Sequence, residues 1–140
     1  MTDGCFFEDL TVGQSASFAK TVTEADVVLF AGVTGDLNPV HVNAEAASKS
    51  LFGERIAHGM LCASFISTVL GTRLPGPGTI YMSQSLRFTA PVKIGQTVQA
   101  TVTVTALNPE KRRATLQTVC TVNGQVVVDG EALVKVPSRG

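Results

Sequence analysis

Polar and apolar residues alternate through the C-terminal part of the chain. Over residues 97–106, threonines and one glutamine take one set of positions, and valines and alanines take the other. This period of two is typical of a half-buried β-strand. Residues 114–122 and 125–136 are the next two strand candidates, and the Asn123-Gly124 pair between them is a strong signal for a two-residue hairpin turn. Strands joined by turns this short must run antiparallel.

The first half of the chain predicts short helices that follow one strand. Residues 15–22 are a strand candidate, and residues 80–90 are another, which a proline closes. Thr23 precedes two acidic residues, which predicts a helix that begins after Thr23. That helix must end near Gly35, where glycine, asparagine and proline cluster. Residues 43–50 predict a second short helix, capped by its asparagine.

A continuous apolar segment lies between these two parts. Residues 60–70 are apolar or small on every side, so we expect a helix that is buried all round and stopped by Gly71. An antiparallel sheet of about five strands can bury its apolar face by wrapping around this helix, which is an α+β arrangement in a single domain over residues 1–140. Such a sheet leaves an edge to pair, and a second copy of the chain is one way to cover it.

Composition limits the kinds of partner. Apolar residues make up 44% and charged residues 16% of the chain, which argues against disorder and suggests that a second subunit covers part of the surface. The net charge is zero with no basic block, so we expect no nucleic-acid partner, and no apolar segment is long enough for a membrane span. The first residues, with Glu8 and Asp9, form no leading apolar run, and the cysteines Cys5, Cys62 and Cys120 follow no pattern. We therefore expect no signal peptide, no structural disulfide and a cytoplasmic location.

The candidate chemistry lies in residues 30–41, a stiff turn that carries Asp36 and His41 five positions apart. An acid and a histidine on a rigid turn can activate water. Spacing alone leaves two alternatives open: Asp36 bonds nearby backbone groups, as turn residues do, and His41 is a packing histidine. The chain lacks the further acidic ligands of a calcium loop and the ligand spacing of a zinc site, so we expect no metal.

The His58-Gly59 pair, at the expected start of the buried helix, is a second candidate. Free backbone N–H groups at a helix start point outward and favour negative charge, which makes Gly59 a candidate oxyanion donor. The alternative is an ordinary glycine at a crowded helix start. Cys62 and the hydroxyl residues of the same helix have no base beside them in sequence, which favours packing over a nucleophilic role. Residues 111–113 are a short basic cluster, either a solvated turn or a contact for ligand phosphates.

One motif resembles that of a known family. It consists of Gly35-Asp36-Leu37-Asn38-Pro39-Val40-His41, then Ala46-Ala47, then His58-Gly59-Met60. This string is similar to the hydratase 2 motif of the MaoC-like family, the (R)-specific enoyl-CoA hydratases with a hot-dog fold. The resemblance covers nearly the whole chain, whose length is near that of the short bacterial members linked to polyhydroxyalkanoate.

The resemblance implies an activity and the roles of four residues. Asp36 and His41 would be the catalytic pair that adds water to a trans-2-enoyl-CoA and forms a (3R)-3-hydroxyacyl-CoA. The backbone N–H of Gly59 would bind the thioester oxygen, and Asn38 would help to hold the turn or the water. Asp36 is the expected base, and either Asp36 or His41 then delivers a proton to C2. No cofactor is expected besides the coenzyme A of the substrate, and the resemblance implies a homodimer.

The acyl pocket and three rival functions complete these expectations. Ser67, Leu70 and Val134 are expected to shape the end of the pocket, because Ser67 and Leu70 share a helical face and Val134 lies on the last strand. The rivals are a hot-dog acyl-CoA thioesterase, a non-catalytic acyl-CoA binding domain, and a related dehydratase for branched or dicarboxylic acyl-CoA. The motif favours hydration over the first two and does not separate it from the third.

Overall fold

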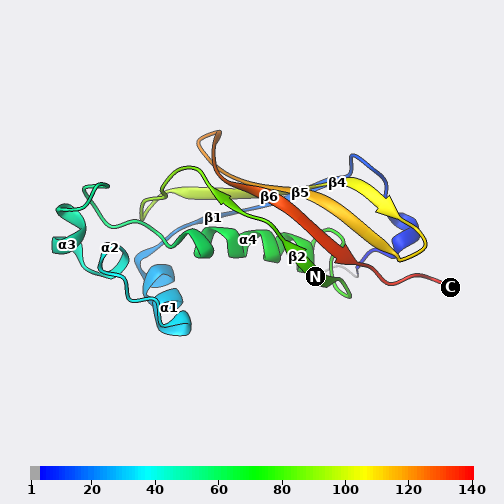
Figure 1. Ribbon diagram of the computed structural model, residues 1–140, viewed down its shortest axis with the longest axis horizontal. Helices are drawn as coiled ribbons and strands as arrows, with labels where there is room; N and C mark the ends of the chain where they lie inside the picture. The colour runs from blue at the N-terminus through cyan, green and yellow to red at the C-terminus, as the bar shows by residue number, and fades with distance from the viewer. Residues whose placement is uncertain (1–3) are drawn as a thin grey trace.

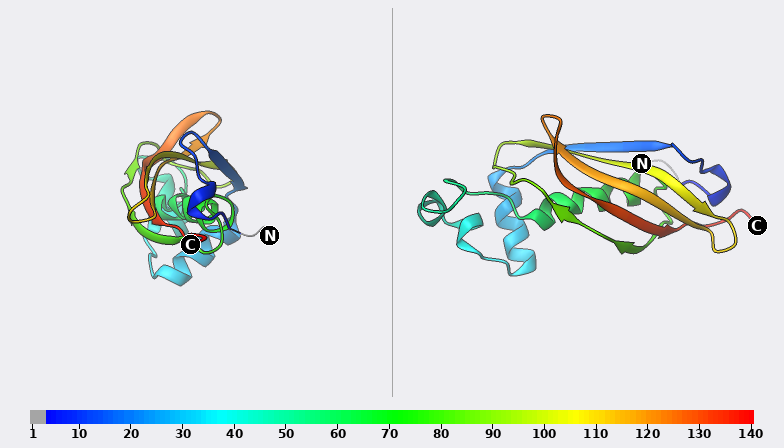
Figure 2. Two further views of the ribbon diagram at one scale, coloured as in Figure 1. Left: turned by 90° about the vertical axis from the view of Figure 1, so that its right-hand side faces the viewer. Right: turned by 45° about the horizontal axis from the view of Figure 1, so that its top comes forward.

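An antiparallel sheet wraps around one long helix in the computed structural model, which describes residues 4–140 (Figure 1). The helix, α4, spans Gly59–Thr72 and packs against four of the strands. The end-on view in Figure 2 shows the sheet curling around it. The strand order is β1 (Ser15–Thr21), β4 (Thr97–Asn108), β5 (Arg113–Val122), β6 (Gln125–Lys135) and β2 (Ile80–Gln84), with β3 (Arg87–Phe88) also paired to β6. The predicted α+β hot-dog fold is confirmed, with six strands in the described part of the chain.

The sixth strand arises because the predicted strand over residues 80–90 is interrupted. β2 and β3 both pair with β6, but the chain leaves the ladder between them. There the amide of Ser85 donates to the carbonyl of Glu131 at 2.9 Å. The carbonyl oxygen of Ser85 lies 1.8 Å from the position that a Cβ on Gly130 would take. The missing side chain of Gly130 therefore makes room for the break.

The strands β4, β5 and β6 follow the predicted alternation. On β4, Val98, Ala100 and Val102 point into the core and have no exposed surface. Every second residue of β5 is buried in the same way. Asn123 and Gly124 both have positive φ, 50° and 79°, as a type I′ hairpin turn requires. The predicted hairpin is confirmed, since β5 and β6 pair antiparallel on either side of this turn.

Burial of α4 is one-sided. Its broad inner face, which includes Ile66, Val69 and Leu70, is at most 1% exposed. Met60 is 55% exposed and begins an outer stripe that also contains the exposed residues Ser64 and Ser67. The prediction of burial on every side is therefore wrong for the described chain. The cause is that small hydroxyl residues recur at helical spacing on the outer side, and periodicity alone did not separate them from the core face.

The end of α4 also differs from the expectation. The helix continues through Gly71 and ends at Thr72. The amides of the next two residues both donate to the carbonyl of Val69 at 2.9 Å, and Pro75 follows. Glycine weakens a helix interior, whereas proline and the residue before it cannot continue the helix. The predicted stop at Gly71 is therefore wrong, and Pro75 sets the limit.

Three short helices gather beyond one end of the sheet, beside the start of α4 (Figure 1). They are α1 (Glu24–Thr34), α2 (Pro39–Val42) and α3 (Ala44–Ser48), and a 3-10 helix (Phe7–Asp9) precedes β1. Thr23 accepts a hydrogen bond from the backbone of Asp26, which caps α1 as predicted, and Gly35 ends α1 at φ 80°. Asn43 caps α3 in the same way.

The segment between α1 and α3 is more ordered than a turn. Pro39 occupies the first position of the single-turn helix α2, where its missing N–H and fixed φ suit a helix start. His41 therefore lies in a helix, and the prediction that it lies in a turn is wrong. The expectation that no helix runs through Asn38 and Pro39 is confirmed, because α1 and α2 are separate.

Cys5, Cys62 and Cys120 are free thiols. Burial raises the pKa of the Cys62 thiol to about 11 and, together with the neighbouring Cys62, that of the Cys120 thiol to about 12. Among residues 4–140, no helix combines the length and the hydropathy that crossing a bilayer requires.

Candidate active site

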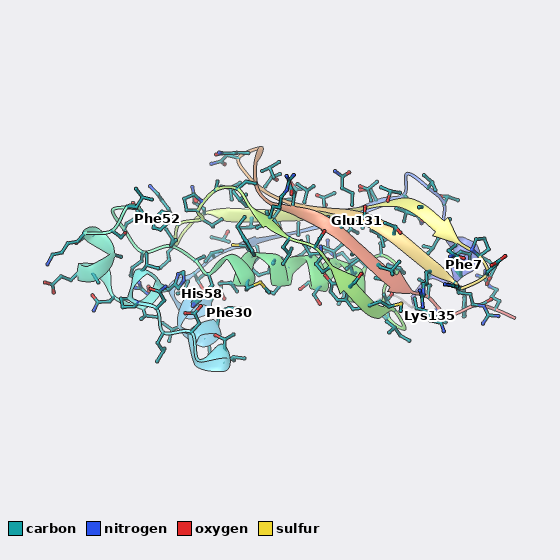
Figure 3. All side chains as sticks on the ribbon, in the orientation of Figure 1. Phe7, Phe30, Phe52, His58, Glu131 and Lys135 are labelled. Carbon is teal, nitrogen blue, oxygen red and sulfur yellow. The ribbon has the colours of Figure 1, made fainter. Side chains whose placement is uncertain are left out.

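A hollow of about 480 Å³ lies between α2, the segment before α4, the start of α4 and residues 88–92 at and after β3. Three polar side chains on its wall come from the two sequence candidates: Asp36, His41 and His58. One side-chain nitrogen or oxygen of each lies within 4.8 Å of the others. Figure 3 shows His58 beside Phe30, between α1 and the start of α4. The structure thus brings together the stiff turn and the helix start, which are separated in sequence.

Three of the four polar atoms of Asp36 make hydrogen bonds. Its backbone N–H donates to Thr34 Oγ1 at 3.1 Å, and its Oδ1 accepts from the backbone N–H of Asn38 at 3.2 Å. Its backbone carbonyl accepts from a ring nitrogen of His58 at 3.0 Å. Within residues 4–140, the second carboxylate oxygen, Oδ2, accepts no hydrogen bond. The turn-forming bond expected of Asp36 is present, and it leaves one carboxylate oxygen for a ligand.

The imidazole of His41 has a defined tautomer. Its Nδ1 lies 2.8 Å from the carbonyl oxygen of Ile56. A carbonyl only accepts hydrogen bonds, so Nδ1 carries the proton and the neutral ring keeps a lone pair on Nε2. His41 is 9% exposed and its backbone carbonyl accepts from Arg55 Nε at 2.6 Å. His41 is thus satisfied at one ring nitrogen, as a packing histidine is, and offers an acceptor at the other.

Gly59 is the first residue of α4, and its missing side chain is a requirement of packing. A Cβ at this position would lie 2.6 Å from Cδ1 of Phe88. The helix start is crowded, as the alternative interpretation expected. The preceding residue, His58, makes no side-chain capping bond to the helix. The first amides of this 14-residue helix therefore stay open to the hollow that Gly59 and Met60 line. The open amide and the crowding are compatible with each other.

Asn38 holds the turn. Its side-chain oxygen accepts from the backbone N–H of Val40 at 3.2 Å and so caps α2. Of the two roles expected for Asn38, holding the turn is the one for which the structure provides a bond. The cap fixes the helical turn that carries His41.

The three expected acyl-pocket residues do not line one hollow. A second hollow of about 500 Å³ lies beside α4 and β2, and it shares Met60 with the first. Ser67 lines this hollow, whereas Leu70 and Val134 are core residues, 1% and 0% exposed, that line neither hollow. The boundary between the outer stripe and the core face of α4 passes between Ser67 and Leu70, although they are three residues apart.

The sequence interpretation missed the contacts of His58 and the role of Phe88. His58 is 2% exposed, and its ring stacks on that of His41 at 3.9 Å with an interplanar angle of 26°. The available signal was that the only two histidines of the chain flank the same region. For Phe88 the sequence carried no signal, because its contact with Gly59 joins α4 to β3. Stacked rings also aim their lone pairs along nearly parallel planes, so His41 and His58 do not converge on one metal ion.

Cys62 and the basic cluster at residues 111–113 take no part in the proposed site. Cys62 lines the hollow but keeps its proton, because burial raises its pKa to about 11. The basic cluster at residues 111–113 lies at the β4–β5 turn, at the opposite end of the molecule from α1, α2 and α3 (Figure 2). Within one chain this cluster is therefore remote from the hollow.

Comparisons with known proteins agree with this geometry. Residues 9–129 match the family model described as a MaoC like domain. An (R)-specific enoyl-CoA hydratase of Rhodospirillum rubrum is 63% identical over 96% of this chain and 94% of its own length. A 3-hydroxybutyryl-CoA dehydratase of Methylorubrum extorquens is 54% identical over 96% of this chain and 85% of its own length. The solved structure of an (R)-hydratase from Aeromonas caviae, involved in PHA biosynthesis, superposes with a TM-score of 0.91 at 45% identity, over 93% of this chain and 99% of that one.

The family match, the identity over nearly the whole chain and the shared fold lead to one conclusion: the chain belongs to the MaoC-like domain family.

Proposed function

We propose that this protein adds water to the double bond of a trans-2-enoyl-CoA and forms a (3R)-3-hydroxyacyl-CoA, with dehydration as the reverse reaction. The names of its relatives, an (R)-specific enoyl-CoA hydratase and a 3-hydroxybutyryl-CoA dehydratase, support both directions. The observation that carries the proposal is that Asp36, His41 and Gly59 line one hollow, with Asp36 Oδ2 and His41 Nε2 as free acceptors and the Gly59 amide at the open start of α4.

Two acceptors suit one water molecule. A water that donates one proton to Asp36 Oδ2 and the other to His41 Nε2 directs its oxygen lone pairs away from both, toward a substrate carbon. In this scheme the carboxylate of Asp36 removes a proton as the water oxygen attacks C3. His41 holds and orients the same water. The pair divides the task between a base and a positioning acceptor.

The thioester oxygen gains negative charge as C3 is attacked. The N–H of Gly59 donates to this oxygen, and the positive end of the α4 dipole lies beside it. One donor of this kind typically stabilises the transition state by about 3 kcal/mol.

The proton for C2 comes from Asp36. His41 has no proton on Nε2, and its Nδ1 proton is bound to the carbonyl of Ile56. Asp36 has just taken a proton from water, and returning it to C2 restores the carboxylate. Water thus adds to one face of the double bond, and Asp36 and His41 both return to their starting protonation states. No metal is needed in this scheme, because the Gly59 amide stabilises the charge on the thioester oxygen. No separate cofactor is needed, because coenzyme A is part of the substrate.

The acyl chain extends from the first hollow past Met60 into the second, along Ser67. In this proposal Leu70 and Val134, which are both buried in the core, lie behind the wall of that path. Leu70→Ala is expected to admit longer acyl chains, because a smaller side chain in the core would let the residues that line the second hollow move inward. An unchanged chain-length preference would count against this path.

A homodimer through the β2 edge completes the proposal. β2 ends the strand order, and its Ile80, Tyr81 and Met82 are 58%, 41% and 42% exposed. A second copy paired at this edge would cover these apolar side chains together with the second hollow. Light scattering on the purified protein should give twice the chain mass, and Met82→Lys should shift it toward the monomer. A monomeric wild-type protein at micromolar concentration contradicts this arrangement.

We place the enzyme in the cytoplasm, where its free thiols stay reduced. There it would supply hydroxyacyl-CoA from fatty-acid oxidation or for polyhydroxyalkanoate synthesis.

The main rival is a thioesterase on the same fold. Crotonyl-CoA separates the two: hydration removes the enoyl-thioester absorbance without releasing thiol, whereas hydrolysis releases free coenzyme A. Chiral analysis should find the (3R) alcohol. Release of thiol at the rate of absorbance loss overturns the proposed function, and so does binding of crotonyl-CoA without turnover. A panel of branched and dicarboxylic enoyl-CoA substrates tests the dehydratase alternative.

A further inference from the structure

His58 contacts all three parts of the proposed site. Its ring stacks on His41 at 3.9 Å, and its Nε2 lies 3.0 Å from the backbone carbonyl oxygen of Asp36. It is also the residue before Gly59, and its φ of −60° and ψ of 136° set the direction in which α4 begins. No other described residue combines these three contacts.

The hydrogen bond to Asp36 determines the tautomer of His58. The carbonyl of Asp36 accepts, so Nε2 of His58 is the donor and carries the proton. Nδ1 is then a buried acceptor, and it has no hydrogen-bond partner within residues 4–140. Leaving a buried polar atom unpaired costs about 1–3 kcal/mol. The protein keeps a histidine here despite that cost, so a purely space-filling role does not explain the residue.

The bond acts on the backbone of the proposed base. The N–H of Asp36 is bound to Thr34 and its Oδ1 to the N–H of Asn38. The carbonyl is the remaining anchor, and His58 supplies it from another segment of the chain. Both other anchors lie within two residues of Asp36, so among the hydrogen bonds of Asp36 itself only the one from His58 ties it to the start of α4.

We propose that His58 is a positioning residue: its Nε2–H holds the turn of Asp36 against the start of α4, so that Oδ2 and the Gly59 amide face the same substrate. The inference rests on the proposed hydratase function. His58 does not exchange a proton with the substrate in this role, since its one proton is bound to the Asp36 carbonyl.

Two substitutions separate the bond from the ring. His58→Gln keeps a nitrogen donor at nearly the same reach but removes the stacking ring. His58→Phe keeps a ring over His41, removes the donor and also removes the unpaired Nδ1. A space-filling role predicts that phenylalanine is the better replacement, and a proton-transfer role predicts that both fail equally. Positioning through Nε2 predicts that glutamine rescues kcat and phenylalanine does not.

The measurements are kcat and KM for crotonyl-CoA, with thermal unfolding of each variant as the check on folding. We expect His58→Phe to fold and to lose about 10²-fold in kcat with KM within about 3-fold, and His58→Gln to stay within about 10-fold of the wild-type kcat. In an Asp36→Asn background, His58→Phe should cost less than about 3-fold, because it acts through Asp36. A kcat for His58→Phe equal to or above that of His58→Gln overturns the inference, and so does a full additive loss in the Asp36→Asn background. If the wild-type protein itself does not hydrate crotonyl-CoA, the proposed function fails, which is a separate result.

Discussion

The Nδ1 atom of His41 lies 2.8 Å from the carbonyl oxygen of Ile56, and this bond leaves Nε2 as an acceptor in the hollow. His41→Ala removes that acceptor and leaves a water bound to Asp36 alone. We expect kcat for crotonyl-CoA hydration to fall by about 10²–10⁴-fold, and the unpaired Ile56 carbonyl to lower the free energy of unfolding by about 1–3 kcal/mol. Enoyl-thioester absorbance and urea unfolding measure the two effects. A folded His41→Ala enzyme with wild-type kcat would show that the imidazole does not take part.

The Gly59 amide can be tested apart from the crowding around it. Phe88→Ala first removes the ring that a Cβ at position 59 would meet at 2.6 Å. In that background, Gly59→Ala keeps the N–H and Gly59→Pro removes it, and proline suits the first position of a helix. The proline variant should have a kcat about 10²–10³-fold below that of the alanine variant. Equal kcat values in the two double variants would leave Gly59 with a packing role only.

Arg55 is expected to stabilise the site from behind His41. Its Nε donates to the His41 carbonyl at 2.6 Å and its Nη1 binds both carboxylate oxygens of Glu24 at 2.8 and 2.7 Å. The Arg55 side chain is 16% exposed. Arg55→Met keeps most of the apolar stem and removes these bonds, so we expect unfolding to require about 1–3 kcal/mol less and kcat to fall about 3–10-fold.

The control for Arg55 is Lys49→Met. Lys49 pairs with Glu45 at 3.8 Å, with side chains 77% and 84% exposed. Such a surface pair contributes little, so the free energy of unfolding should change by less than about 0.5 kcal/mol. Similar losses from the two substitutions would refute the special role of Arg55.

The two buried thiols, Cys62 and Cys120, are expected to lower the free energy of unfolding as the pH becomes alkaline. Burial raises the pKa of Cys62 from 9.0 to about 11 and that of Cys120 to about 12. The unfolded chain loses these protons near pH 9.0, so above that pH the folded state binds more protons than the unfolded state. The contribution of the two thiols to the free energy of unfolding is therefore fully present below pH 9 and is lost as the pH rises toward about 12. Urea unfolding at about pH 8 and about pH 10.5 measures the fall, which should be smaller in Cys62→Ala/Cys120→Ala; an equal fall would contradict it.

The predictable parts of this fold are those that local sequence determines. The strict alternation over residues 97–106 becomes β4, and Asn123-Gly124 becomes the hairpin, because period and turn chemistry need only neighbouring residues. Asp36 and His41 were also predictable as a pair, since one short segment contains both. The start of α4 at His58-Gly59 was predictable as well, although the contact of His58 with His41 was not.

The unpredicted parts depend on how separate elements meet. The stripe of α4 that faces outward follows from the rotation of the helix against the sheet, and this rotation separates Ser67 from Leu70. The packing of Phe88 over Gly59 joins β3 to α4, and the stacking of His58 on His41 joins α4 to α2. No local pattern specifies such contacts, because each results from the packing of the whole domain.

The most direct measurement is the rate of crotonyl-CoA hydration by Asp36→Asn. Asparagine keeps the shape of the side chain and an oxygen that can accept from the Asn38 backbone N–H, so the variant should fold with an unfolding midpoint near that of the wild type. It cannot take a proton from water, and kcat should fall by about 10²–10⁴-fold with KM within a few-fold. A folded Asp36→Asn enzyme that hydrates crotonyl-CoA at close to the wild-type kcat would contradict the assignment of Asp36 as the base.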